Sequence, residues 1–266
     1  MRKRSLIASG VALVLGAVLA ASVGLRGSGS DGTVTAATLD QAVDGVLSQL
    51  GPGKALRIVT ASYARQGPSA AEVAASEWPA PERWTTERWV VFGEDGQSTT
   101  SRVISRDASG RVWQETARVG DQRVSRNFYT GNTLSFPWRP YSVETQVAIV
   151  KARNLAPVLE GQGTLTEGLL DGQRSAVLER QYPITPDMYP AKDGFAVPDL
   201  SDLNGETLVS RTEVAVENPL FVRWSLYAVD RDGQRHLVER RETVAVEVVD
   251  LADVPEHVLT TPSWAS

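Results

Sequence analysis

Turn signals recur at short intervals between residues 87 and 138, and they constrain the fold of this chain more than any other feature. Asp95-Gly96 is the strongest of them, because an Asp-Gly pair between two alternating segments is typical of a two-residue hairpin. Strands joined by such short turns are antiparallel neighbours. The pattern predicts five strands, at Glu87–Phe92, Ser98–Arg106, Arg111–Val119, Gln122–Thr130 and Thr133–Trp138.

Strand patterns continue on both sides of this meander. Ala55–Arg65 alternates in the manner of a strand, and Leu169–Tyr182 reads as a hairpin that turns at Asp171-Gly172. Between this hairpin and the last strands lies a long segment, 183–205, rich in Pro, Asp and Gly. Three further strands are predicted at Thr207–Val216, Phe221–Val229 and Gln234–Val249.

Two segments have helical periodicity. Apolar residues recur every three or four positions over Leu39–Leu50, with Thr38 as the predicted N-cap and Gly51-Pro52-Gly53 as the stop. Ser142–Leu155 is the second predicted helix, with a strand over Val147–Val150 as the alternative. These elements predict an α+β fold that is mainly antiparallel β. Because a large open sheet curls, we expect a curved, open half-barrel of about ten strands with one or two helices on its concave face.

The N-terminus predicts export. Three basic residues at positions 2–4 precede an uncharged stretch, 5–25, that is long enough to span a bilayer. The basic flank places the N-terminus in the cytoplasm and the domain on the extracytoplasmic side. Residues 1–26 are therefore a signal peptide or a membrane anchor, so the domain is either held at the cell membrane by residues 5–25 or secreted after cleavage. Residues 27–37 are a flexible linker, and residues 38–266 form the domain.

Composition excludes several classes of function. The chain has 27 Lys+Arg against 32 Asp+Glu, for a net charge of -5, and this argues against nucleic acid as a partner. It has no Cys, and its two His, His236 and His257, are predicted to lie on the surface. We find no nucleophile elbow, phosphate-binding loop or zinc-protease motif, so we expect neither an enzyme nor a cofactor.

A carboxylate-dependent hydrolase is the weakest of the open alternatives. Glu77, Glu82 and Glu87 lie near Trp residues, as the acidic residues of a glycoside hydrolase do. That reading requires two carboxylates that face each other across a cleft.

Large apolar residues at alternate strand positions define the candidate site. If they fall on the concave face they line an apolar pocket of the kind that takes a lipophilic ligand; in the simpler interpretation they are ordinary core. The candidate ligand-binding residues are Trp89, Val91, Trp113, Phe128, Phe136, Trp138, Trp224 and Leu226.

The order of elements resembles the LolA/LolB/LppX/RseB-like superfamily of extracytoplasmic proteins. Four places carry the resemblance: the helix at Leu39–Leu50 before the first strand, the meander from Trp89 to Trp138, the hairpin at Asp171-Gly172, and the closing unit from Val214 to Asp250. The resemblance covers residues 39–255. Two features depart from the family pattern: the N-terminal segment, if it is retained as an anchor, and the long segment 183–205.

The resemblance implies a half-barrel whose helices cover an apolar concave face, and a non-enzymatic protein that binds an acyl chain, a lipid or a lipoprotein. A second implied possibility is an RseB-like regulatory module that contacts another membrane protein in envelope signalling, such as an anti-sigma factor. In that case the interior is ordinary core.

Overall fold

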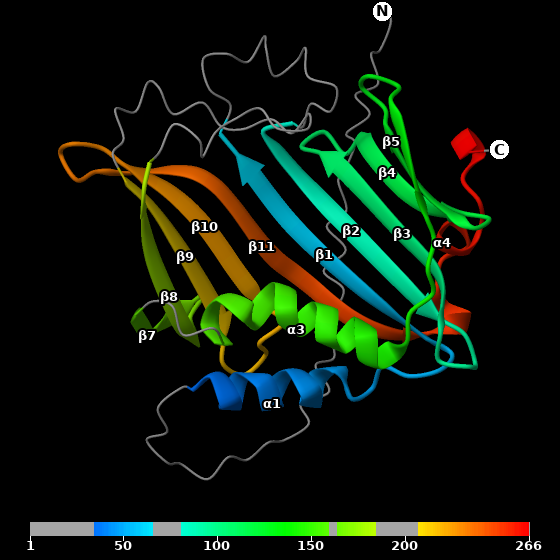
Figure 1. Cartoon of the computed structure of the whole chain (residues 1–266), viewed down its shortest axis with the longest axis horizontal. Coiled ribbons are helices and arrows are strands. Elements are labelled where there is room, and N and C mark those ends of the chain that lie inside the picture. Colours follow the sequence, from blue (N-terminus) through cyan, green and yellow to red (C-terminus); the bar gives the residue numbers. More distant parts are fainter. Residues whose placement is uncertain (1–34, 66–80, 160–163, 185–206, 266) are drawn as a thin grey trace, which may run out of the picture. The chain divides into compact units, whose positions relative to one another are not determined.

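The computed structural model describes residues 35–65, 81–159, 164–184 and 207–265, which fold around one open antiparallel sheet of 11 strands (Figure 1). The strand order is β6-β5-β4-β3-β2-β1-β11-β10-β9-β8-β7. The strands are β1 Lys54–Ala64, β2 Arg83–Phe92, β3 Ser98–Asp107, β4 Val112–Val119, β5 Gln122–Asn127, β6 Thr133–Pro137, β7 Thr164–Leu170, β8 Gln173–Pro183, β9 Thr207–Ala215, β10 Val222–Val229 and β11 Arg235–Asp250. The prediction of a mainly antiparallel sheet is confirmed.

Two meanders meet at the centre of the sheet. Strands β1 to β6 follow one another outward in one direction, and β11 to β7 do so in the other. The first strand pairs with the last, so that Leu56 lies opposite Val248. The two edge strands, β6 and β7, are consecutive in the chain and are linked through helix α3 (Val143–Leu159). The connection between the two edges therefore passes through α3.

Helix α1 (Ala36–Leu47) begins earlier than the sequence pattern predicts. Its N-cap is Thr35, whose hydroxyl accepts a hydrogen bond from the Thr38 amide at 3.2 Å. The Thr38 hydroxyl accepts one in return from the Thr35 amide at 3.0 Å. Thr38 is thus the third helical residue of a capping box rather than the N-cap, because either threonine fits the local preference for a hydroxyl at a helix start.

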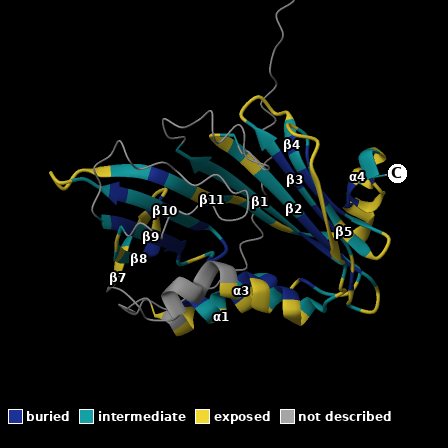
Figure 2. Ribbon diagram, turned by 45° about the horizontal axis from the view of Figure 1, so that its top comes forward, coloured by how far each residue is buried: buried dark blue, intermediate teal, exposed yellow. Residues whose placement is uncertain are grey.

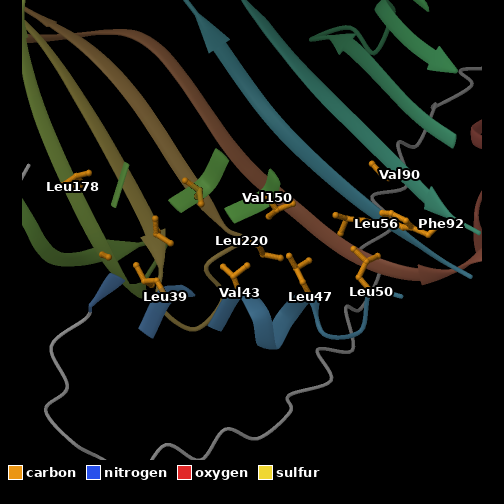
Figure 3. Packing of buried hydrophobic residues seen from close by; sticks show 13 residues of the cluster. Leu39, Val43, Leu47, Leu50, Leu56, Val90, Phe92, Val150, Leu178 and Leu220 are labelled. Carbon is orange, nitrogen blue, oxygen red and sulfur yellow. The ribbon is translucent and has the colours of Figure 1, made fainter. Parts of the chain in front are cut away.

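The main core lies between the two helices and one face of the sheet (Figure 3). We call this the helix face. Helix α1 contributes Leu39, Val43 and Leu47, each at most 2% exposed. These residues fill the apolar part of the face at the end where the helices lie. The cluster comprises Leu39, Val43, Leu47, Leu50, Leu56, Val90, Phe92, Val150, Ala176, Leu178, Val214, Leu220 and Val222.

The C-terminal segment, residues 251–265, packs on the other side of the sheet, which we call the opposite face. It contains two 3-10 turns, Leu251–Asp253 and Ser263–Ala265, and a short helix, α4 (Glu256–Leu259), which lies beside β3 (Figures 1 and 2). Val254 and Val258 pack against Ala55, Trp89 and Val91. The segment leaves the strand ladder after Asp250 but remains part of the domain.

Residues 1–34 lie outside the described part of the chain, so the predicted signal or anchor and most of the linker stay predictions. Within the described residues, no helix combines the length and apolar character needed to cross a membrane.

Candidate functional site

The register of the sheet decides which face each candidate residue occupies, because residues paired across adjacent strands point to the same side. Leu56 and Val90 are paired with each other and belong to the helix-face core. Positions of the same parity along these strands therefore face the helices, and the alternate positions face away. Five of the eight candidates lie on the helix face: Trp113, Phe136, Trp138, Trp224 and Leu226.

The prediction that all eight share one face is wrong for Trp89, Val91 and Phe128. Trp89 pairs with Arg57, and Val91 with Ala55, on the opposite face. Phe128 follows Arg126 by two residues and so points to the same side, the opposite face. Its ring lies 6.1 Å from that of Trp264. The alternation is ambiguous in the sequence because the C-terminal segment covers this face and makes apolar residues favourable on both sides.

Trp113 is the extra residue of a β-bulge in β4, since Ser105 pairs with Gln114 while Arg106 pairs with Val112. Its side chain is only 4% exposed. The Trp113 ring lies 6.1 Å from Trp84 and 6.3 Å from Tyr129. Within the described part of the chain, the Trp113 indole N–H has no hydrogen-bond partner.

Phe136 and Trp138 lie at the β6 edge. Phe136 is 53% exposed, and Trp138 is half-buried. The Trp138 ring lies 6.2 Å from Tyr141, and the Arg118 guanidinium lies 5.5 Å from its centre. Trp138 therefore connects the end of the edge strand to the residues just before α3.

Trp224 and Leu226 lie on β10, three strands from β2. The Trp224 indole donates a hydrogen bond to the Ser210 hydroxyl at 3.3 Å, and the Arg241 guanidinium lies 5.8 Å from its ring centre. Leu226 packs beside a separate small core of Leu208, Ala228 and Val238. The five helix-face candidates are thus spread over several strands and do not form one compact cluster.

Sequence reasoning missed three aromatic residues that matter. Trp84 falls just before the predicted strand Glu87–Phe92, although it alternates with Thr86 and Val90 on the helix face. Tyr129 sits just beyond β5, and Trp264 lies in the C-terminal segment, which no local pattern ties to the sheet. The alternation of Trp84 with the following strand was the one signal available.

A buried polar network lies on the opposite face. The Arg102 guanidinium is 2.6 Å from the Glu115 carboxylate, and Trp264 donates its indole hydrogen bond to Glu115 at 2.5 Å. Arg102 also donates to the Thr260 carbonyl at 3.1 Å, and Arg126 to that of Trp264 at 3.3 Å. Beside this network is a small polar pocket of about 200 Å³, lined in part by Thr100, Arg102, Ala117 and residues 258–261.

The two candidate carboxylates that the structure describes, Glu82 and Glu87, do not gather in a cleft. Glu87 lies on the opposite face, where it accepts hydrogen bonds from Arg57 at 2.7 Å and from the Trp89 indole at 3.1 Å. Glu82 is exposed, and Glu77 lies outside the described residues. Over the described ranges, no three His, Cys, Asp or Glu side chains are grouped so that they could hold a metal ion.

One pair of titrating groups lies beside Trp113. The Ser109 hydroxyl and the Tyr129 hydroxyl, the latter at 2.8 Å, both donate to Asp107, and these bonds lower the pKa of Asp107 to about 2. Partial burial and the bond to Asp107 raise the pKa of Tyr129 to about 12. The Arg111 guanidinium lies 5.4 Å from the Tyr129 ring centre.

No family model matches the chain, and no curated protein matches it. Among solved structures, an uncharacterised conserved protein from Thermus thermophilus aligns with a TM-score of 0.34 and 10% identity over 84% of this chain and 93% of that chain. A DUF1329 family protein from Desulfovibrio piger aligns with a TM-score of 0.29 and 11% identity over 83% and 94%. A LolA superfamily protein from Nitrosomonas europaea aligns with a TM-score of 0.24 and 11% identity over 86% and 99%. With scores this low, the description of the fold rests on this chain's own strand order.

Proposed function

We propose that this chain is a non-enzymatic binding protein of the extracytoplasmic space, with a LolA-like half-barrel whose helix face takes an acyl chain or a lipidated partner. The observation that carries the proposal is the character of the helix face. Two helices cover its core end mainly through aliphatic contacts, and five of the predicted ligand contacts lie on the same face. Apolar area removed from water supplies the affinity, and no covalent step is needed.

The connection between the two edge strands is compatible with a sheet that curves over the helices. Helix α3 has 17 residues, so it is about 25 Å long. Eleven strands laid flat are separated edge to edge by roughly 48 Å. The nine other residues of the link, 138–142 and 160–163, add at most about 30 Å when extended, so the link fits edges that are drawn toward each other, as in a half-barrel, without requiring them.

An acyl chain on this face competes with α1. Leu39, Val43 and Leu47 already occupy the apolar positions that a ligand seeks. We infer that α1 shifts when a ligand enters. Two ion pairs join α1 to α3, from Lys151 to Asp40 at 2.9 Å and to Asp44 at 2.7 Å.

A lipid-extraction experiment tests the proposal. The full-length protein is purified from membranes and its bound lipid is identified by mass spectrometry, and a fluorescent fatty acid is then titrated into delipidated protein. Phe136→Ser, on the helix face, weakens binding severalfold. Leu259→Ser is the matched control, because Leu259 is 45% exposed but lies on α4, on the opposite face. Lipid-free protein that takes up no fatty acid contradicts the proposal.

The regulatory alternative keeps one specific observation in its favour. Several residues of the helix-face core are at most 2% exposed, as expected if that core is ordinary packing. An RseB-like module then binds a membrane protein through its surface. Crosslinking in intact cells, followed by purification from detergent-solubilised membranes, separates the two: a stoichiometric protein partner with no bound lipid favours the module.

A further inference from the structure

Beyond the helices, the helix face changes from apolar to polar. Ile58 and Val246 are paired on this face. The next residues on the same face, moving along the strands away from the helices, carry hydroxyl groups and form a row across four adjacent strands. Thr86 and Ser105 share a hydrogen bond of 3.0 Å within it. The row consists of Thr243, Thr60, Thr86 and Ser105. Nearby on the same face, the Thr116 hydroxyl donates to that of Ser125 at 2.8 Å.

The next row is aromatic at two places. Trp224 pairs with Arg241, Arg241 with Ser62, and Ser62 with Trp84. Trp84 and Trp224 are therefore three strand spacings apart, about 14 Å. Both are half-buried. The Trp84 ring contacts the Trp113 ring, which in turn contacts the ring of Tyr129, a residue that is 39% exposed. The row therefore ends in three aromatic rings in contact.

The charged groups of this row already have partners within the domain. Arg241 pairs with Glu239 at 2.6 Å, and Asp107 accepts hydrogen bonds from Ser109, from the Arg111 amide and from Tyr129. Apart from the Asp107 carboxylate, whose neutral donors leave its charge in place, the row offers ring faces and hydroxyl groups. The indole N–H of the 96%-buried Trp113 adds a donor that the described residues leave without an acceptor, and buried indoles usually have one.

We propose that this far half of the helix face binds a neutral glycan. Sugar rings present C–H faces that the negative face of an indole attracts, and hydroxyl groups that match a row of Thr and Ser, each of which both donates and accepts. Two indoles about 14 Å apart correspond to an oligosaccharide of a few units. The proposal shares Trp113 and Trp224 with the predicted acyl-chain contacts, but it needs no bound lipid, because its hydroxyl row and Trp84 lie beyond the aliphatic cluster.

Indole N–H signals in the nitrogen–proton NMR spectrum of the full-length protein test this, since Trp residues lie on both faces. The probes are maltotriose, cellotriose and mannotriose at millimolar concentration. At least one of them should shift the signals of Trp113 and Trp224 and leave those of Trp89 and Trp264, on the opposite face, in place. If none moves either helix-face signal, or if Trp89 and Trp264 move equally, the proposal is wrong.

Substitutions sharpen the test. Trp113→Phe removes the indole donor and replaces the two-ring indole with a single smaller ring, so affinity for the active trisaccharide should fall roughly three- to tenfold. Trp89→Phe is the matched control, because its indole bonds to Glu87 on the opposite face, and it should leave the affinity unchanged. Equal affinity in the wild type and Trp113→Phe overturns the role of the indole donor. Fatty-acid titration of the same proteins reports separately on the acyl-chain proposal.

Discussion

Arg102 on β3 and Glu115 on β4 form an ion pair that is almost completely shielded from water, with 2.6 Å between guanidinium and carboxylate and side-chain exposures of 7% and 11%. Burying two charges is costly, so this pair depends on the further hydrogen bonds that surround it. Those bonds come from the C-terminal segment, through the Thr260 carbonyl and the Trp264 indole. The pair therefore fixes the end of the chain to the sheet.

Removing one partner of this ion pair should destabilise the domain strongly. Glu115→Leu leaves the Arg102 charge buried without its carboxylate and should lower the free energy of unfolding by about 3–5 kcal/mol in urea titrations. The double variant Arg102→Leu with Glu115→Leu should recover much of that loss. Glu167→Leu breaks the exposed pair with Arg174 and is the control, with a change of about 1 kcal/mol or less. Equal effects at the two sites would contradict this account.

The Trp264 indole should contribute measurably to the stability of the domain. Trp264→Phe keeps a ring beside Phe128 but loses the 2.5 Å hydrogen bond to the Glu115 carboxylate, which is worth about 1.5–3 kcal/mol for a charged acceptor. Trp224→Phe, which loses a 3.3 Å bond to a neutral hydroxyl, should cost about 0.5–1 kcal/mol. Hydrogen exchange should show faster exchange of the Val258 amide in Trp264→Phe alone.

The Asp107–Tyr129 pair should make stability depend on pH at both extremes. The folded pKa of Asp107, about 2, is below its unfolded value, so its contribution is complete above that value, about 4, and is lost as the pH falls toward 2. The folded pKa of Tyr129, about 12, is above its unfolded value, so its contribution is complete below about pH 10 and is lost as the pH rises toward 12. Tyr129→Phe should raise the pKa of Asp107 in a carboxyl carbon NMR titration. An unchanged titration midpoint would count against the hydrogen bond.

Two glycine-to-alanine substitutions should change the stability of the domain in opposite directions. An added Cβ at Gly168, on β7, would lie 2.7 Å from Cγ2 of the buried Val177, so Gly168→Ala should destabilise the domain by about 1–3 kcal/mol. Gly45 is exposed on α1 with nothing within 4 Å of an added Cβ, so Gly45→Ala should stabilise it by about 0.5–1 kcal/mol. Thermal and urea unfolding of both variants measures this. A stable Gly168→Ala would mean that Val177 can move aside.

Local signals predicted the elements well. Turns such as Asp95-Gly96 and Asp171-Gly172 separate strands that fall within a few residues of the predicted ranges. Hairpin turns can be predicted from sequence because they need particular backbone angles that few residues adopt, such as the positive φ of Gly96 and Gly172. The predicted helices at Leu39–Leu50 and Ser142–Leu155 likewise correspond to α1 and α3.

Relations between distant residues could not be predicted in the same way. Nothing near Leu56 or Val248 indicates that the first and last strands pair, because pairing depends on the whole sheet. The faces of Trp89 and Phe128 were mistaken because a segment near the C-terminus covers them, and only tertiary contact reveals that cover. The polarity change along the helix face was also hidden, since it follows rows across strands rather than the order of residues.

The pairing of β1 with β11 has a consequence for biogenesis. Until residues 235–250 have left the ribosome, β1 and β10 each present an unsatisfied backbone edge in the middle of what will become the sheet. Such edges invite wrong partners. A nascent chain of this protein therefore remains vulnerable to aggregation almost to the end of its synthesis, and a premature stop before Arg235 yields two half-sheets that cannot be joined.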